Sequence, residues 1–250
     1  MSMYKYMKIK SENKKSGITA SDLKYLAVMA MFIDHVAYLF VQDGTALYYC
    51  MRFIGRITAP VMCFFISEGY HYTRNLKKYF QRMAVFAVIS HFAFAFCFNG
   101  SFIHSGRESM ITTLFLSLLA VHLVNSDKIK KEFILPAIIV ICWLADFCDW
   151  GMEAVIYTLA FELARGNRKN QLVAYGITAG TFKLFPLIVM TMNDISYFPE
   201  NWFRLGVFIP IPLLFLYNGE KGGGKYTKWV FYVFYPAHLL LLGVINYVYG

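Results

Sequence analysis

The chain has 250 residues, of which 58% are hydrophobic and only 16% are charged, and its formal net charge is +9. A charged fraction so far below the roughly 25% of soluble domains indicates a membrane protein. The positive charge does not indicate a nucleic-acid partner, because the lysines and arginines fill short gaps between apolar runs instead of forming one basic surface.

Residues 1–18 lack the apolar core of a signal peptide and predict a short cytoplasmic tail. Residues 19–250 predict a single membrane domain. Its apolar runs predict an all-α polytopic protein of about nine transmembrane helices, at about 23–41, 47–70, 80–98, 110–125, 133–148, 152–164, 172–191, 202–217 and 229–249. Two of these runs, 133–148 and 152–164, are shorter than a perpendicular span, so they form either two spans or one re-entrant hairpin.

The charged loops predict how the helices are oriented. Lysine and arginine are concentrated in the N-terminal segment and in alternate loops, whereas the loops between them carry mainly aspartate and glutamate. The positive-inside rule therefore predicts a multi-pass protein of the cell membrane with a cytoplasmic N-terminus and an outer C-terminus. The five cysteines are scattered without CxxC spacing, so no metal is expected.

The first predicted helix carries Asp34 and His35 about halfway along the run LKYLAVMAMFIDHVAYLF. Ionisable groups at this depth cost at least a few kcal/mol, so they indicate a functional site. Lys24 precedes His35 by eleven positions, and the two side chains share one helix face about 16 Å apart. This face suits an elongated anionic donor whose charged end stays at Lys24 while its reactive end reaches His35. Asp34 is rotated by about 100° and is expected to pair with Arg56.

The second predicted helix carries Arg52 and Arg56 on one face, and Glu68 nearer its cytoplasmic end. Arg56 or Lys183 is expected to stabilise a developing oxyanion, whereas Arg52 either joins the site or anchors the outer interface by snorkelling. A count of about 1.5 Å per residue places five ionisable residues near one plane in mid-membrane: His35, Arg56, His91, Lys183 and His238.

A structural ion-pair cluster that joins helices is the alternative interpretation, with Asp34 paired to Arg56 and Glu68 paired to His71 or Arg74. Such a cluster also satisfies the rule that charges inside a membrane face one another or a water-filled cavity.

Later segments carry weaker signals. Asp146, Asp149 and Glu153 flank the turn DWG and predict an acidic outer rim on which an amine-bearing acceptor docks. His238 lies in the run YPAHL, where it is either a second proton acceptor or a hydrogen-bonded interhelical residue. The stretch GEKGGGK, residues 219–225, matches the start of a phosphate-binding loop, but no strand precedes it, so a flexible basic cytoplasmic loop is expected.

Four stretches carry a resemblance to a known family: IDHVAYLF, RFIGRITAPVMCFFISEGYHYTRNLKKYFQRMAVFAVIS, ADFCDWGMEAV and FYVFYPAHLLLL. The chain resembles TraX proteins, the membrane proteins named for the acetylase of conjugative F-type pilin, from about residue 19 to 249. It departs from the family pattern at His91, where an acidic residue is expected.

The TraX family is similar to a branch of the transmembrane acyltransferases, a group that includes bacterial surface-polysaccharide O-acetylases and the lysosomal heparan glucosaminide N-acetyltransferase. The resemblance implies a transmembrane acyltransferase-like fold, acetyl-CoA bound from the cytoplasm and an acceptor presented from the other side. In that group a basic or polar residue precedes the catalytic histidine by eleven positions, a pattern that Lys24 and His35 match.

We therefore expect an integral-membrane acetyltransferase in which His35 acts as a general base or as a transient acyl carrier. The expected catalytic residues are His35, Asp34, Arg56 and His238, and the expected donor-binding residues are Lys24, Glu68, Lys183 and Arg52. The acceptor is either a pilin-like peptide N-terminus or a surface glycan, and the oligomeric state stays open, with a homodimer as one option. A proton-coupled transporter and a non-enzymatic membrane assembly factor are the alternative functions.

Overall fold

The computed structural model describes residues 16–103, 106–224 and 227–249. Nearly all of the predicted tail, residues 1–18, lies outside these ranges, as does the end of the 219–225 stretch. The described chain is helical: α2 Ala20–Phe40, α3 Ala46–Gly55, α4 Thr58–Tyr72, α5 Leu76–Asn99, α6 Met110–Val124, α7 Lys131–Ala145, α8 Gly151–Leu163, α9 Arg168–Ala179, the π-helix η1 Gly180–Leu184, α10 Phe185–Asn193, α11 Tyr197–Asn201, the 3-10 helix η2 Trp202–Phe208, α12 Pro210–Phe215 and α13 Thr227–Tyr249.

Each predicted apolar run coincides with helical structure, and the all-α class is confirmed. Among the described residues, five stretches are long and apolar enough to cross a membrane: Ala20–Phe40, Ala46–Tyr72, Leu76–Asn99, Arg168–Asn193 and Trp229–Tyr249. The chain is therefore a multi-pass membrane protein. The helices α6, α7 and α8 have 15, 15 and 13 residues, which is less than the roughly 20 residues that a perpendicular span needs.

The start of α2 is fixed by its own cap and by a distant loop. Thr19 caps the helix in a capping box with Asp22. The next two backbone N–H groups donate to carbonyls of residues 220 and 221. Gly222 has a positive φ of 61°, and a Cβ there would overlap Thr19. The described part of the glycine-rich stretch is therefore docked on α2, where a flexible loop was expected.

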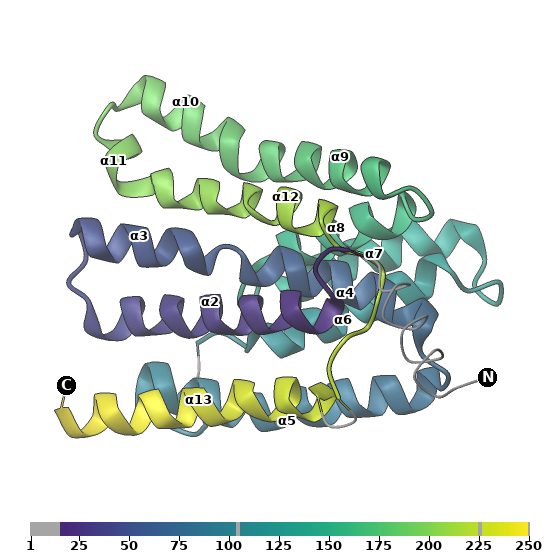
Figure 1. The fold of residues 1–250 in the computed structure, drawn as a ribbon, viewed down its shortest axis with the longest axis horizontal. Coiled ribbons are helices and arrows are strands. Elements are labelled where there is room, and N and C mark those ends of the chain that lie inside the picture. Colours follow the sequence, from purple (N-terminus) through teal and green to yellow (C-terminus); the bar gives the residue numbers. More distant parts are fainter. Residues whose placement is uncertain (1–15, 104–105, 225–226, 250) are drawn as a thin grey trace, which may run out of the picture.

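The long helices lie roughly side by side, with α5 and α13 along one edge of the molecule, α2, α3 and α4 in the middle, and α9 to α12 along the other edge (Figure 1). We call the end at which α2 begins, at Ala20, the proximal end, and the end at which it finishes, at Phe40, the distal end. The three short helices α6, α7 and α8 lie toward the proximal end (Figure 1). The distal half of the bundle therefore has fewer helices to fill its interior.

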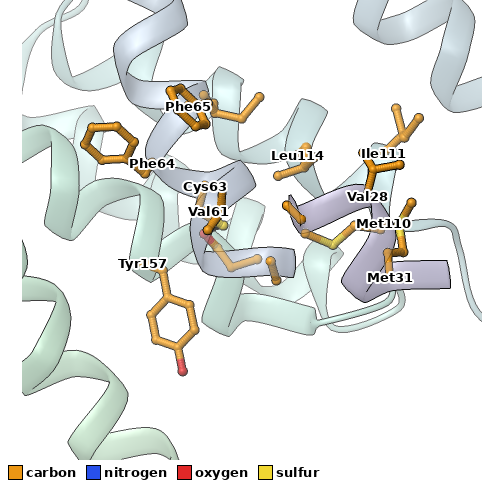
Figure 2. Close-up of a cluster of buried hydrophobic side chains, with 14 of the residues drawn as sticks. Val28, Met31, Val61, Cys63, Phe64, Phe65, Met110, Ile111, Leu114 and Tyr157 are labelled. Atoms are coloured by element: carbon orange, nitrogen blue, oxygen red, sulfur yellow. Dashed lines mark hydrogen bonds between the residues drawn. The ribbon is translucent and has the colours of Figure 1, made fainter. Parts of the chain in front are cut away.

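The hydrophobic core joins α2, α4, α6 and α8 (Figure 2). Phe64 of α4 and Tyr157 and Phe161 of α8 are fully buried, and α8 packs against α4, α6, α7 and α9. This short helix is thus the centre of the proximal half, and its first residues face the space that the distal half leaves open.

Candidate functional site

A cavity of about 730 Å³ lies at the N-terminal end of α8. Its walls come from α2, α3, α5, the α7–α8 connection and η1. The lining residues are Asp34, His35, Tyr38, Arg52, Arg56, Phe94, Phe98, Asn99, Gly106, Arg107, Asp146, Cys148, Asp149, Trp150, Gly151, Met152, Glu153 and Lys183. A pocket lined by so many ionisable groups needs water or a polar ligand to satisfy them.

Two histidines from the first and last long helices meet at this cavity. His35 Nδ1 lies 2.9 Å from His238 Nε2, and the two rings are nearly parallel, with centroids 5.1 Å apart. His238 Nδ1 lies 2.9 Å from the backbone carbonyl oxygen of Phe234, one turn earlier on α13. Both imidazoles are buried, at 7% and 4% exposure.

These contacts assign the protons of the neutral pair. A carbonyl oxygen only accepts, so His238 Nδ1 carries the proton and its Nε2 is an acceptor. His35 Nδ1 must then donate to that acceptor, which leaves a lone pair on His35 Nε2. None of the residues that the structure describes hydrogen-bonds to His35 Nε2, and His35 lines the cavity. The arrangement presents a proton acceptor to whatever occupies that space.

Asp34 binds two arginines, Arg52 within α3 and Arg56 at the C-terminal end of that helix. Arg52 Nη1 donates to Oδ2 at 2.8 Å, and Arg56 Nη2 donates to Oδ1 at 2.9 Å. The predicted pair of Asp34 with Arg56 is therefore present. The side chain of Arg52 is only 16% exposed, so it joins the site and does not snorkel to an interface. Gly55 lets α3 approach, because a Cβ there would overlap the Asp34 carboxylate.

Lys183 reaches the cavity from the π-helix η1, and its Nζ lies 2.7 Å from a carboxylate oxygen of Glu153. Glu153 stands in the first turn of α8. The i→i+5 hydrogen bonds of a π-helix widen the turn and so change the direction of the side chains that follow, and such segments are frequent at functional sites. The structure thus pairs Lys183 with one of the three acidic residues of the predicted rim.

Asp149 is one of four carboxylates that line the cavity, with Asp34, Asp146 and Glu153, and it forms no ion pair with any residue within the described ranges. Its removal from water raises the pKa of its carboxyl, whereas Arg56 lowers it. The next residue, Trp150, has a φ of 68°, a left-handed conformation that is uncommon for a residue other than glycine. Its ring lies under the Arg56 guanidinium, 4.9 Å from centroid to Cζ. The strained turn at Trp150 therefore holds its ring in a cation–π contact with Arg56.

Three predicted residues lie elsewhere. Lys24 does stand on the His35 face of α2, but it packs over the Phe65 ring at 4.7 Å and does not line the cavity. Glu68 pairs with Arg165 at 3.5 Å, so its prediction as a partner of His71 or Arg74 was wrong.

His91 does not join the predicted plane of ionisable residues around His35. It pairs with Glu108 at 2.8 Å and lines a separate pocket of about 400 Å³ between α5 and α6. His71 instead binds Glu162, a buried carboxylate that also accepts from Ser67 and Asn125. Sequence reasoning missed Glu162, although its position inside an apolar run was a signal.

Sequence reasoning also missed the aromatic wall of the cavity, Phe94 and Phe98 of α5. Their spacing of four residues places both on one helix face. Nothing in the sequence separates them from the many lipid-facing aromatic residues, so this signal was too weak to use.

The fold and the site define an all-helical multi-pass membrane protein with a histidine pair and an arginine–aspartate cluster at a cavity between its helices. The chain belongs to the TraX family, because the family model described as TraX protein matches residues 19–246. This confirms the resemblance inferred from the sequence motifs. A relative in Dichelobacter nodosus, the probable fimbrial assembly protein FimC, serogroup H1, is 33% identical over 236 residues, which cover 90% of this chain and 94% of that protein. No solved structure matches the chain.

Proposed function

We propose that this protein is an integral-membrane acyltransferase that moves an acetyl group from cytoplasmic acetyl-CoA to an amine or hydroxyl acceptor on the outer side of the cell membrane. The observation that carries the proposal is the oriented histidine pair, in which Nε2 of His35 keeps its lone pair and His35 lines a charged cavity. Membership in the TraX family supports the same activity through the resemblance of that family to transmembrane acyltransferases.

In the proposed reaction, His35 Nε2 takes the proton from the acceptor N–H or O–H while that atom forms a bond to the thioester carbonyl carbon. The C–S bond then breaks, and His35 returns the proton to the thiolate of CoA. In the two-step alternative, Nε2 itself attacks the carbonyl carbon, and the C–S bond breaks to release the thiolate of CoA; the acceptor then attacks the acetyl group, displaces Nε2 and gives up its proton to the released imidazole nitrogen. Arg52 and Arg56 supply positive charge for the oxyanion, and Asp34 holds both guanidinium groups in place.

The donor and the acceptor approach from opposite ends. We assign the proximal end to the cytoplasm. With about nine helical passes, lysine- and arginine-rich connections alternate along the chain with acidic ones, and the positive-inside rule assigns the basic connections to the cytoplasmic side. Lys24 stands about 16 Å from His35 toward this end, which suits the anionic part of acetyl-CoA. The cavity belongs to the distal half and receives the acceptor.

The site favours an amine as the acceptor. Asp149 lines the cavity without an ion pair among the described residues, and a carboxylate so placed can accept a hydrogen bond from a neutral amino group, whose lone pair stays available for attack. The name of the Dichelobacter relative, a fimbrial assembly protein, favours a pilin-like peptide N-terminus over a surface glycan.

The same name favours a second function, a non-enzymatic assembly factor. The decisive test is incubation of the purified protein with labelled acetyl-CoA and a peptide amine. We expect release of CoA and labelled peptide, and a loss of at least about 100-fold in His35→Ala. His122→Ala is the matched control, because His122 binds Tyr70 away from the cavity. An unchanged rate in a folded His35→Ala variant would exclude His35 as the base, and no turnover in the unmodified protein would favour the assembly factor.

A further inference from the structure

The wall of the cavity beside His35 has an aromatic section and a charged section. Phe98 of α5 meets the His35 ring edge to face, with ring centroids 5.6 Å apart. The Phe94 ring packs against Phe98, with centroids 4.6 Å apart. Tyr38 of α2 contacts the same Phe98 ring at 5.4 Å. Asp34 and the arginines that it binds form the charged section, which adjoins Tyr38 because the Arg52 Cζ lies 5.5 Å from the centroid of that ring.

An alkyl group held near His35 can therefore pack favourably on one side only. Packed against the charged section, it would remove water from ionised groups without replacing their hydrogen bonds. Packed against Phe98, it loses only contact with water, which is favourable. The carbonyl carbon of a reacting thioester has to lie about 3–3.5 Å from the acceptor atom that His35 deprotonates, so its alkyl group starts at this wall.

The aromatic wall is held in place by close helix packing. A Cβ on Gly243 of α13 would lie 2.8 Å from Phe96 Cδ1 and 3.0 Å from Cys97 Cα, so α5 and α13 approach as closely as glycine permits. The same contact fixes α13, which carries His238. Phe98 consequently has little freedom to withdraw from His35 and admit a longer chain.

We propose that Phe98, backed by Phe94, is the residue that restricts the transferred acyl group to a short one, acetyl in preference to longer straight chains. This inference rests on the proposed acyltransferase function and deepens it. Replacement of Phe98 by alanine removes the ring that limits the space, so two or more additional methylene groups then fit against Phe94.

The experiment compares acetyl-CoA with butyryl-CoA on purified full-length protein in detergent, with the same amine acceptor. We expect the unmodified protein to use acetyl-CoA at least about tenfold better. In Phe98→Ala, the ratio of kcat/KM for butyryl-CoA to that for acetyl-CoA should rise by about tenfold or more, because each buried methylene contributes about fourfold. The ratio is measured on one preparation, so partial loss of folded protein cancels. Phe98→Leu, a milder change, should give an intermediate ratio.

The matched control is Phe92→Ala, since Phe92 stands on the same helix, is 47% exposed and does not line the cavity. Its ratio should equal that of the unmodified protein. Turnover with an unchanged ratio in both Phe98 variants would overturn this inference alone. Absence of turnover with every donor would overturn the proposed function and this inference with it.

Discussion

A backbone carbonyl on one helix sets the proton position of a side chain on another. The carbonyl of Phe234 fixes the tautomer of His238, and His238 in turn fixes that of His35. The donor atom of each ring is thereby satisfied inside the protein, and the remaining lone pair is on Nε2 of His35, a residue that lines the cavity. The pair therefore joins a buried histidine of the last long helix to one of the first.

Replacement of His238 by phenylalanine should lower kcat for acetyl transfer by about ten- to a hundredfold, with little change in KM for acetyl-CoA. The reason is that His35 Nδ1 loses its acceptor and the tautomer with a free Nε2 is no longer favoured. His238→Gln offers a carbonyl oxygen to the same proton and should recover part of the rate. Equal rates in the two variants, measured by CoA release, would contradict the positioning role.

Asp34 is the carboxylate that neutralises both Arg52 and Arg56. Its replacement by asparagine leaves two largely buried cations without that charge, and we expect the free energy of unfolding to fall by about 3–5 kcal/mol. Thermal unfolding in detergent would measure this change. Asp43→Asn, in the exposed α2–α3 turn, is the control and should unfold as the unmodified protein does.

At the scale of elements, the lengths of the helices create the cavity. α2, α5 and α13 have 21, 24 and 23 residues, but α8 has 13 and begins partway along the bundle. The open space at its N-terminal end is then walled by neighbours that continue past it. Hydropathy locates each of these helices well because burial and lipid contact leave a local record in the sequence. It does not reveal the π-helix η1, which changes the direction of Lys183 without changing composition.

The α5–α13 contact gives a test at this scale. Gly243→Ala should destabilise the protein by about 1–3 kcal/mol, because the added methyl group meets Phe96 and the backbone of Cys97. Gly180→Ala makes the same change at a helical glycine with no atom within 4 Å of the new Cβ, and its stability should be unchanged or slightly higher. The midpoint of thermal unfolding compares the two. A midpoint for Gly243→Ala as high as that for Gly180→Ala would show that the helices are not tightly packed there.

At the scale of the whole molecule, the proposed reaction depends on orientation. The donor requires the proximal end in the cytoplasm, and the acceptor requires the distal end outside. Alternating basic loops supply the reason for that orientation.

Alkaline phosphatase, which folds only outside the cytoplasm, should be active when it is fused after residue 250 and inactive when it is fused before residue 1. A fluorescent protein that folds only in the cytoplasm should give the opposite pattern. Activity of the phosphatase at the N-terminus would reverse the assignment of the two ends and remove the cytoplasmic route for acetyl-CoA.

The sequence by itself determined the helical membrane class, the positions of the apolar runs, the mid-helix location of His35 and the pairing of Asp34 with Arg56. These are properties of one helix or of two consecutive helices, and hydropathy and helical periodicity record them directly. Counting residues also gave each ionisable group a depth along its helix.

Only the tertiary structure decided which helices are neighbours and how each is rotated about its axis. It joined His35 to His238 across 203 positions, gave Lys183 the partner Glu153, and put Phe98 beside the histidine. It also removed His91 from the group, although the depth count had placed that residue in the same plane. Depth is one coordinate of three, and the other two depend on packing between segments far apart in the chain.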